Sequence, residues 1–478
     1  MRAGLWVGIL CIVWGLFPLH TVAQGNKKAK VKIVNADSLL VGTLGKPSRF
    51  IGNVHMTHEN TLMWCDSLYQ YELPDSNYLE AFGHVRVIKN DSIRMSGDYM
   101  YYDANKKLIQ VRRNVTLEDP QMILTTDFLD YDGLFDIGYY FNWGQLKDSQ
   151  NTLDSKKGNY FTQTKIALFK DSVKVNSPEY LIFSDTLKYN TDTKLVSILG
   201  PTNIYGKGDE NNTLYSEDGW YDSNLGHAEL YKNNRVTHQS YEGVADTIDS
   251  ITGMAYLYWN VTLVDTVNNV IVKGEYAQMD REQNKAFVTD SALLIMVGKQ
   301  DSLFVHGDTL FMDQDSAKNQ ILRAYYKVKF FSQDLQGLCD SMVYLSVDST
   351  ITLYNEPVAW ASGNQMTAEK ISLLTGNGTI KEFYLNTKAF MVSRREETEM
   401  YDQIKGRNMT GYFRDNELYM VYVNGNGETI YFPDDKGNII GVNTANSSNI
   451  RIMIDKRKVT DIVFINKPDG ELNPLFLA

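Results

Sequence analysis

A short pattern recurs along this sequence at a nearly constant spacing. It begins with an acidic residue, continues with Ser or Thr and ends in an apolar residue, and its clear copies start at Asp37, Asp66, Asp185, Asp246, Asp308 and Asp340. Weaker copies start at Asp98, Asp127, Lys156, Glu217, Glu275 and Glu369. We call the first residue of each copy a landmark. Neighbouring landmarks among these twelve are 29 to 33 residues apart. The spacing predicts a linear array of repeated units and not the three or so compact domains that the length alone would suggest.

A second marker precedes each landmark and has the alternation of a β-strand. A polar residue, often Asn after Gly, is followed by alternating apolar residues, as in Gly52-Asn53-Val54-His55-Met56. Period-two alternation indicates a strand with one buried face, and turn residues such as Lys89-Asn90-Asp91 separate the two markers. Each repeat is therefore predicted to be a hairpin.

The residue four positions after many landmarks is aromatic or apolar: Tyr102, Tyr131, Tyr160, Tyr189, Tyr221, Met279, Met312, Tyr344 and Leu373.

The number of expected strands constrains how the hairpins assemble. Two strands per repeat give roughly twenty-four strands, which is too many for one flat sheet. Glycines inside the extended runs would let a strand kink and pass from one wall to a second wall: Gly83, Gly97, Gly274 and Gly307. We expect an all-β chain that forms an elongated, twisted, antiparallel, two-walled β-jellyroll of about twelve hairpin repeats, on the order of 110 Å long at ~4.7 Å per strand.

The N-terminus and the overall charge indicate where the chain works and what it does not bind. An apolar run from Leu5 to Leu19 precedes Thr21-Val22-Ala23, so we predict a signal peptide over 1–23 and export to the periplasm. The net charge of -11 argues against nucleic acid, which needs clustered basic residues. The two cysteines of the mature chain, Cys65 and Cys339, occupy equivalent repeat positions far apart, so both are expected to be free thiols.

Three segments are expected: the signal peptide 1–23, a repeat domain 24–416, and a C-terminal cap or edge-strand segment 417–478 that is richer in Gly and Pro. The inward residues of the repeat strands would form a continuous apolar trough, which could hold lipid or could be a closed core. The candidate trough residues are Val54, Met56, Val85, Val87, Val115, Leu117, Val173, Val175, Val261, Leu263, Val328 and Phe330.

The Gly-Asn-Val strand followed by Asp-Ser/Thr and then Tyr-Asp resembles the OstA-like (organic-solvent-tolerance) family. This family includes LptA-type periplasmic lipopolysaccharide-transport proteins. The resemblance covers about 36–416, and the tail from Asn443 to Pro474 resembles long members from Bacteroidetes-type bacteria; the copies around Leu146 and Val236 depart from the pattern.

The resemblance implies a protein that binds and transports lipopolysaccharide. It would shield lipid A acyl chains in the trough and bridge toward the outer membrane. Its partners would be other transport components or further copies of itself, joined end to end by edge strands, and it could associate with the outer membrane.

Other readings of the sequence remain open. A structural or adhesive cell-surface β-solenoid without lipid cargo would show the same repeats, and so would a polysaccharide-acting enzyme on a parallel β-helix. No catalytic residue, cofactor or metal site is expected, because His55 and His58 are three apart on a strand and would point to opposite faces. The Tyr series is expected to be a stacked structural ladder and not a sugar-binding strip.

Overall fold

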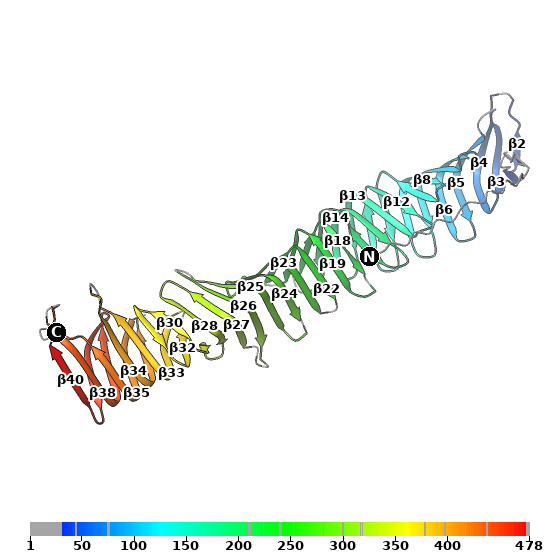
Figure 1. The fold of residues 1–478 in the computed structure, drawn as a ribbon. Coiled ribbons are helices and arrows are strands. Elements are labelled where there is room, and N and C mark those ends of the chain that lie inside the picture. Colours follow the sequence, from blue (N-terminus) through cyan, green and yellow to red (C-terminus); the bar gives the residue numbers. More distant parts are fainter. Residues whose placement is uncertain are drawn as a thin grey trace, which may run out of the picture.

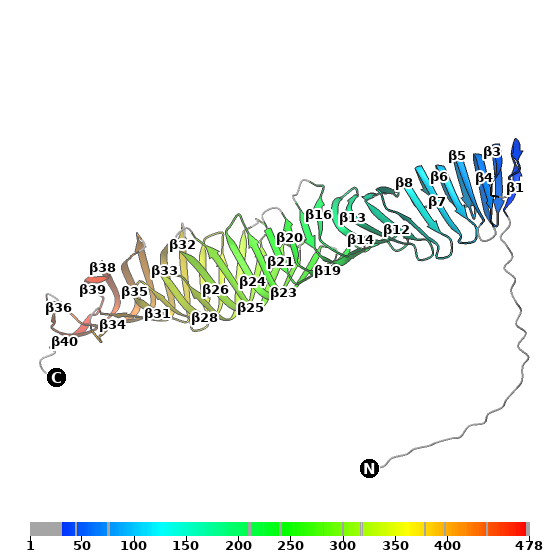
Figure 2. The same cartoon turned by 90° about the horizontal axis from the view of Figure 1, so that it is seen from above.

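The computed structural model is a long, gently curved and twisted rod made of β-strands that succeed one another along its length in sequence order (Figure 1; Figure 2). It describes residues 31–474, except for 44, 74–76, 209–211, 223, 239–240, 252, 281, 299–300, 316, 318, 377–378, 396–397, 416 and 436–437. The expected signal peptide lies outside these residues. Within the described ranges no helix is long and apolar enough to cross a membrane.

Most of the rod is made of long strands. They contain 10 to 16 residues: β3 (Ser48–His58), β4 (Thr61–Glu72), β5 (Asn77–Lys89), β6 (Ile93–Asp103), β7 (Leu108–Glu118), β8 (Ile123–Asp132), β13 (Ile166–Asn176), β14 (Tyr180–Asn190), β23 (Met254–Asp265), β24 (Val270–Asp280), β25 (Lys285–Val297), β26 (Ser302–Gln314), β27 (Gln320–Phe331), β28 (Leu335–Leu345), β33 (Thr379–Arg394), β34 (Tyr401–Arg414), β35 (Glu417–Tyr431) and β38 (Gly441–Asp455).

Elsewhere a long strand is replaced by two short ones, one in each of two walls. Wall A contains β10 (Gly144–Lys147), β11 (Thr152–Ser155), β16 (Thr202–Gly206), β17 (Thr213–Ser216), β20 (Asn234–His238), β21 (Tyr241–Ala245), β30 (Val358–Ala361), β31 (Asn364–Thr367) and β40 (Asp469–Pro474). Wall B contains β9 (Ile137–Tyr140), β12 (Lys157–Phe161), β15 (Leu195–Ile198), β18 (Asp218–Asp222), β19 (His227–Lys232), β22 (Thr247–Ile251), β29 (Thr350–Tyr354), β32 (Lys370–Gly376) and β39 (Lys458–Ile465).

The short strands show that the walls are separate hydrogen-bonded ladders. One half of β14 pairs with β16, which continues through β17, β20 and β21 to β23. The other half of β14 pairs with β15, which continues through β18, β19 and β22 to the same β23. Each long strand therefore bends once and belongs to both walls. All pairings between described strands are antiparallel, which confirms the two-walled β-jellyroll and rules out a parallel β-helix.

The bend in every second long strand is a β-bulge with left-handed residues. In β5, Gly83 (φ 73°) and His84 (φ 44°) together face one residue of each neighbouring strand, and Asn53 and Asn114 have the same conformation at their own bulges. This confirms that Gly83 lies at a kink. Gly97, Gly274 and Gly307 have no left-handed φ. Gly274 instead makes room for its neighbour, because an added Cβ would lie 2.4 Å from Cγ1 of Val288.

The two ends of the rod are formed by short strands. At one end β1 (Lys32–Asn35) and β2 (Ser38–Leu40) pair with the two halves of β3, and at the other end β39 and β40 pair with the two halves of β38. A separate ribbon of β36 (Asp434–Asp435) and β37 (Asn438–Ile439) follows β35. After residue 416 the same sheet continues, because β35 pairs with β34 along its length.

Candidate functional site

One row of apolar side chains runs along the inner face of wall A. Each member lies directly opposite the next in the ladder, so the row passes from strand to strand without a break in pairing. From the N-terminal end it contains Ile33, Met56, Met63, Val87, Met95, Leu117, Leu124, Leu146, Leu153, Val175, Ile182, Ile204, Leu214, Val236, Gly243, Leu263, Val272, Leu294, Val305 and Phe330.

The structure places all twelve sequence-predicted trough residues on the inner side, in two groups. Six are members of the wall A row: Met56, Val87, Leu117, Val175, Leu263 and Phe330. The other six come directly after the bulges, at the angle between the walls, and are at most 1% exposed: Val54, Val85, Val115, Val173, Val261 and Val328. Residues this deep pack against other side chains of the protein.

The series four residues after the landmarks forms a second row, on wall B. Tyr131, Tyr160, Tyr189 and Tyr221 belong to it, and a smaller residue of the neighbouring strand lies between successive tyrosines, such as Gly138 between Tyr131 and Tyr160. No two rings of this series contact one another in the described part of the chain. The expected stacked ladder is therefore wrong for these tyrosines, because another strand lies between successive tyrosines and keeps their rings two strand spacings apart.

Near the N-terminal end, polar side chains join the two walls across the trough. The Tyr102 hydroxyl of wall B lies 2.8 Å from Nδ1 of His58, which projects inward at the end of β3. Lys89 Nζ donates to the Tyr131 hydroxyl at 3.0 Å, and that hydroxyl donates to Asp136 at 2.5 Å. These contacts of Lys89, Tyr131 and Asp136, which we call the clasp, connect the wall A half of β5 to the wall B half of β8 and the turn that follows it.

Lys89 and Tyr131 of the clasp line a small apolar cavity of about 40 Å³, together with Val87, Met95 and Leu117 among others. Burial opposes the charge of Lys89, but the Tyr131 hydroxyl and Asp136 outweigh it, and the pKa of Lys89 is raised. Hydrogen bonds from Tyr131 and Gln163 lower the pKa of Asp136. The clasp is therefore charged on both sides at neutral pH.

In the middle of the rod the apolar row is open to solvent. Apart from Gly243, which is buried, its members there are only partly buried: Val175, Ile182, Ile204, Leu214, Val236, Leu263 and Val272. On either side the row is covered again, since Leu153 is 6% exposed and Leu294 is 7% exposed. Tyr189, Val196 and Tyr221 of the wall B row are partly exposed over the same stretch. We call these partly exposed inner residues of both walls the central window.

Sequence reasoning missed most of the central window. Of its wall A members it found only Val175 and Leu263, because β16, β17 and β20 are short strands with little alternation to read. The copies around Leu146 and Val236, which depart from the repeat pattern, still align in the row. The register of the neighbouring repeats could have identified these residues, because each apolar residue of the short strands occupies the inward-facing position that those repeats predict. In the sequence, the clasp residue Lys89 has only the pattern of a turn residue.

Other predicted features are placed as follows. His55 stacks on Trp64 with ring centroids 4.8 Å apart while His58 points inward, which confirms that the two imidazoles lie on opposite faces. Cys65 and Cys339 are buried and free, as expected. Burial, and next the charge of the adjacent Asp66 or Asp340, raises the pKa of each thiol to about 12.

Comparison with known proteins identifies a matching family and similar solved structures. Residues 28–185 match the family described as OstA-like protein. No curated protein sequence matches the chain. Among solved structures, the chain is similar to LptH from Pseudomonas aeruginosa, the LptA-homologous periplasmic component of the conserved lipopolysaccharide transport device. That likeness has 14% identity and a TM-score of 0.22, and it covers 28% of this chain and 92% of the other.

Proposed function

Because the segment 28–185 belongs to the OstA-like family, we propose that this chain is a periplasmic protein that binds and transports lipopolysaccharide. In this proposal the acyl chains of lipid A lie between the walls and contact the wall A row. The protein is a carrier and not an enzyme. It bridges toward the outer membrane by its length.

The observation that carries the proposal is the row itself. Apolar side chains follow one another across consecutive strands, and in the central window they are reachable from solvent. Each CH₂ of an acyl chain that leaves water for such a surface gains ~0.8 kcal/mol. A row that crosses many strands can accept several chains along the rod, and this supports a lipid cargo over a compact ligand.

Charge supports a cargo that is held by its tails. The chain carries a net charge of -11, which disfavours gripping anionic head groups along the rod. The sugars and phosphates of the lipid would then remain in water outside the walls. Transport needs such a loose hold on the head group, because a tightly bound one would stop the lipid from moving.

The ends of the rod support the proposed bridging. In the part of the chain that the structure describes, β1 and β2 pair with β3 alone, and β39 and β40 pair with β38 alone. Each end therefore presents strand edges to which another chain can add a strand. We propose that other transport components, or copies of this chain, join end to end there, and that 417–478 forms the C-terminal edge segment.

A structural or adhesive role without cargo is the second candidate. It is favoured by the tight packing of the trough away from the central window, where Met63 and Val305 are 1% and 2% exposed. A rod with a closed core needs no ligand. The two candidates differ in whether lipid reaches the central window.

Site-specific photo-crosslinking in cells tests the proposal. A photoreactive residue is placed at Leu214 or Val236, which face inward in the central window, and at Val244, which faces outward on the strand next to that of Val236. We expect lipopolysaccharide adducts at the two inner positions and none at Val244. If the inner positions capture no lipopolysaccharide, the structural role stands instead.

A further inference from the structure

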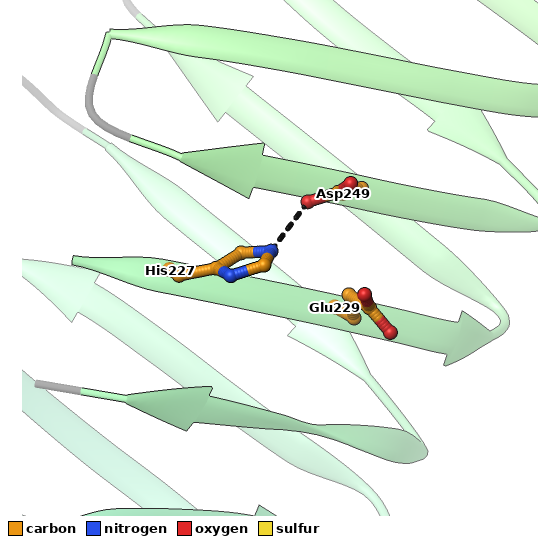
Figure 3. A group of neighbouring side chains, drawn as sticks. All are labelled: His227, Glu229 and Asp249. Carbon is orange, nitrogen blue, oxygen red and sulfur yellow. Dashed lines mark hydrogen bonds and ion pairs between the residues drawn. The ribbon is translucent and has the colours of Figure 1, made fainter. Parts of the chain in front are cut away.

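Three side chains with metal-binding atoms meet on the outer face of wall B, away from the trough. His227 and Glu229 lie two apart on β19, and Asp249 lies on the paired strand β22 (Figure 3). One ligand atom of each lies within 4.8 Å of the other two. Ala228 between the first two points to the inner side, so the strand's alternation places both ligands on one face.

Neighbouring side chains hold the three groups in place. His227 Nε2 lies 2.8 Å from Oδ1 of Asp249, and the Trp220 ring meets the imidazole edge to face with centroids 4.8 Å apart. The Tyr231 hydroxyl donates to Oε2 of Glu229 at 2.5 Å and accepts from the Trp220 indole at 2.8 Å. Partners of this kind orient metal ligands in known sites. The group is therefore organised before any ion binds.

The charges at this place favour a cation. Glu229 and Asp249 are directly opposite in the β19–β22 ladder, where two like charges destabilise a sheet. His227 contacts Asp249 through Nε2. The nearby Tyr258 responds to the same negative potential, because burial first, then the charge of Asp249, raises its pKa, with a smaller contribution from Glu229.

We propose that His227, Glu229 and Asp249 bind one divalent transition-metal ion, of which Zn²⁺ is the one to test. An imidazole and two carboxylates are a ligand set for such ions and leave further positions for water. The sequence carries the signal as His-x-Glu on a strand, although it led us to expect no metal. This site is independent of the proposed lipid cargo.

The location gives the ion a structural effect. It would tie β19 to β22 in the central part of the rod, where wall B consists of strands of four to six residues. Short strands contribute few ladder hydrogen bonds, so a cross-link between two of them stabilises this region more than it would elsewhere. An ion that binds only the folded chain raises the melting temperature.

The chain contains a matched control for this proposal. His84 Nδ1 lies 2.8 Å from Oδ2 of Asp66 on adjacent strands, a His–Asp pair at the same distance but through the other ring nitrogen. The structure places no third metal-binding residue beside that pair among the described residues. A His–Asp pair alone is an ordinary hydrogen bond, so only the three-residue group is expected to hold an ion.

The test uses the tag-free chain from Gln24, treated with EDTA and titrated with Zn²⁺ against a chromophoric chelator. We expect one site with a dissociation constant on the order of micromolar or lower, weakened about tenfold or more by H227A and by D249N, and unchanged by H84A. Zn²⁺ should also raise the melting temperature of the wild type and of H84A but not of H227A, with circular dichroism confirming that each variant folds. A dissociation constant above about 100 µM in the wild type, or the same dissociation constant in H227A as in the wild type, would overturn the proposal.

Discussion

The side-chain amide of Asn260 donates a hydrogen bond to Oδ2 of Asp246 at 2.7 Å, at the bend where β23 passes from one wall to the other. Asn114 bonds to Asp98 at 2.8 Å in the same way, and Asn53 to Asp37 at 2.9 Å. The aspartates are the landmarks of the sequence repeat and the asparagines are its second marker. The two markers recur together because they hold each other at the bend.

This bend can be tested at Asn260, whose φ is 52°. Asn260→Ala removes the amide bond and places an alanine in a left-handed conformation, so we expect a local loss of about 1–2 kcal/mol. Asn260→Gly also removes the amide bond but tolerates this φ, and should lose less.

Hydrogen exchange of the Asp246 amide provides the measurement, because that N–H donates to the carbonyl oxygen of Trp259 at 3.0 Å and closes the bend. Faster exchange in the alanine variant than in the glycine variant is the expected order. Equal protection in both variants and the wild type would show that the bend does not depend on Asn260.

The fold could be predicted from the sequence because its determinants are local. A bulge needs a left-handed residue and a partner for its side chain, and both leave a mark every thirty residues or so, such as Asn114 thirteen residues before Asp127. The division of bent strands into two short ones, as at β15 and β16, could not be predicted. β15 and β16 pair with different halves of β14, and the residues between them, Leu199 to Pro201, belong to neither ladder.

The inner face of the central window can be tested by a charge. Val236→Asp places a carboxylate in the wall A row where an acyl chain would lie, and the position is exposed enough for the charge to stay hydrated. We expect several-fold weaker binding of lipopolysaccharide in a pull-down with immobilised protein.

Val244→Asp is the matched control, since Val244 lies on the neighbouring strand, is 39% exposed and faces outward. Its lipid binding should equal that of the wild type. A similar loss in both variants would indicate a general effect of charge and contradict a role for the inner face.

The clasp is predicted to limit access to the N-terminal part of the trough. Lys89→Met keeps the aliphatic stem but removes the ammonium group that bonds to Tyr131 and lies 3.5 Å from Asp136. With the two walls no longer joined there, a photoreactive residue at Leu117 should capture more lipid than it does in the otherwise unchanged chain.

Arg86→Met serves as the control, because this residue is exposed, comes from the same strand and does not line the cavity. Equal capture at Leu117 in Lys89→Met and in the unchanged chain would show that the clasp does not restrict the trough.

The candidate site was less predictable than the fold, and for a physical reason. Whether an inner residue contacts a ligand or another side chain depends on the distance between the walls. The alternation of apolar residues within one strand carries no information about that distance. Val261 and Leu263 look equivalent in the sequence, yet the first is 1% exposed and the second lies in the central window. The cross-wall bond of Lys89 to Tyr131 joins residues 42 apart and leaves no local pattern.

The two thiols report on the closed angle between the walls. Cys65 and Cys339 are each 5% exposed, and their pKa is raised to about 12 chiefly by burial. In the native chain from Gln24 both should be nearly inert to a thiol reagent such as DTNB at pH 8, and both should react once the chain is unfolded in guanidinium. Cys339→Ala assigns the remaining reactivity to Cys65. The pKa of each thiol is 9.0 in the unfolded chain and about 12 in the folded chain. Between these two pH values the unfolded chain binds fewer protons than the folded chain, so the free energy of unfolding should fall as the pH rises from 9 to 12. Rapid labelling of either cysteine in the native chain at pH 8 would show that the walls open there and would contradict a tightly packed angle.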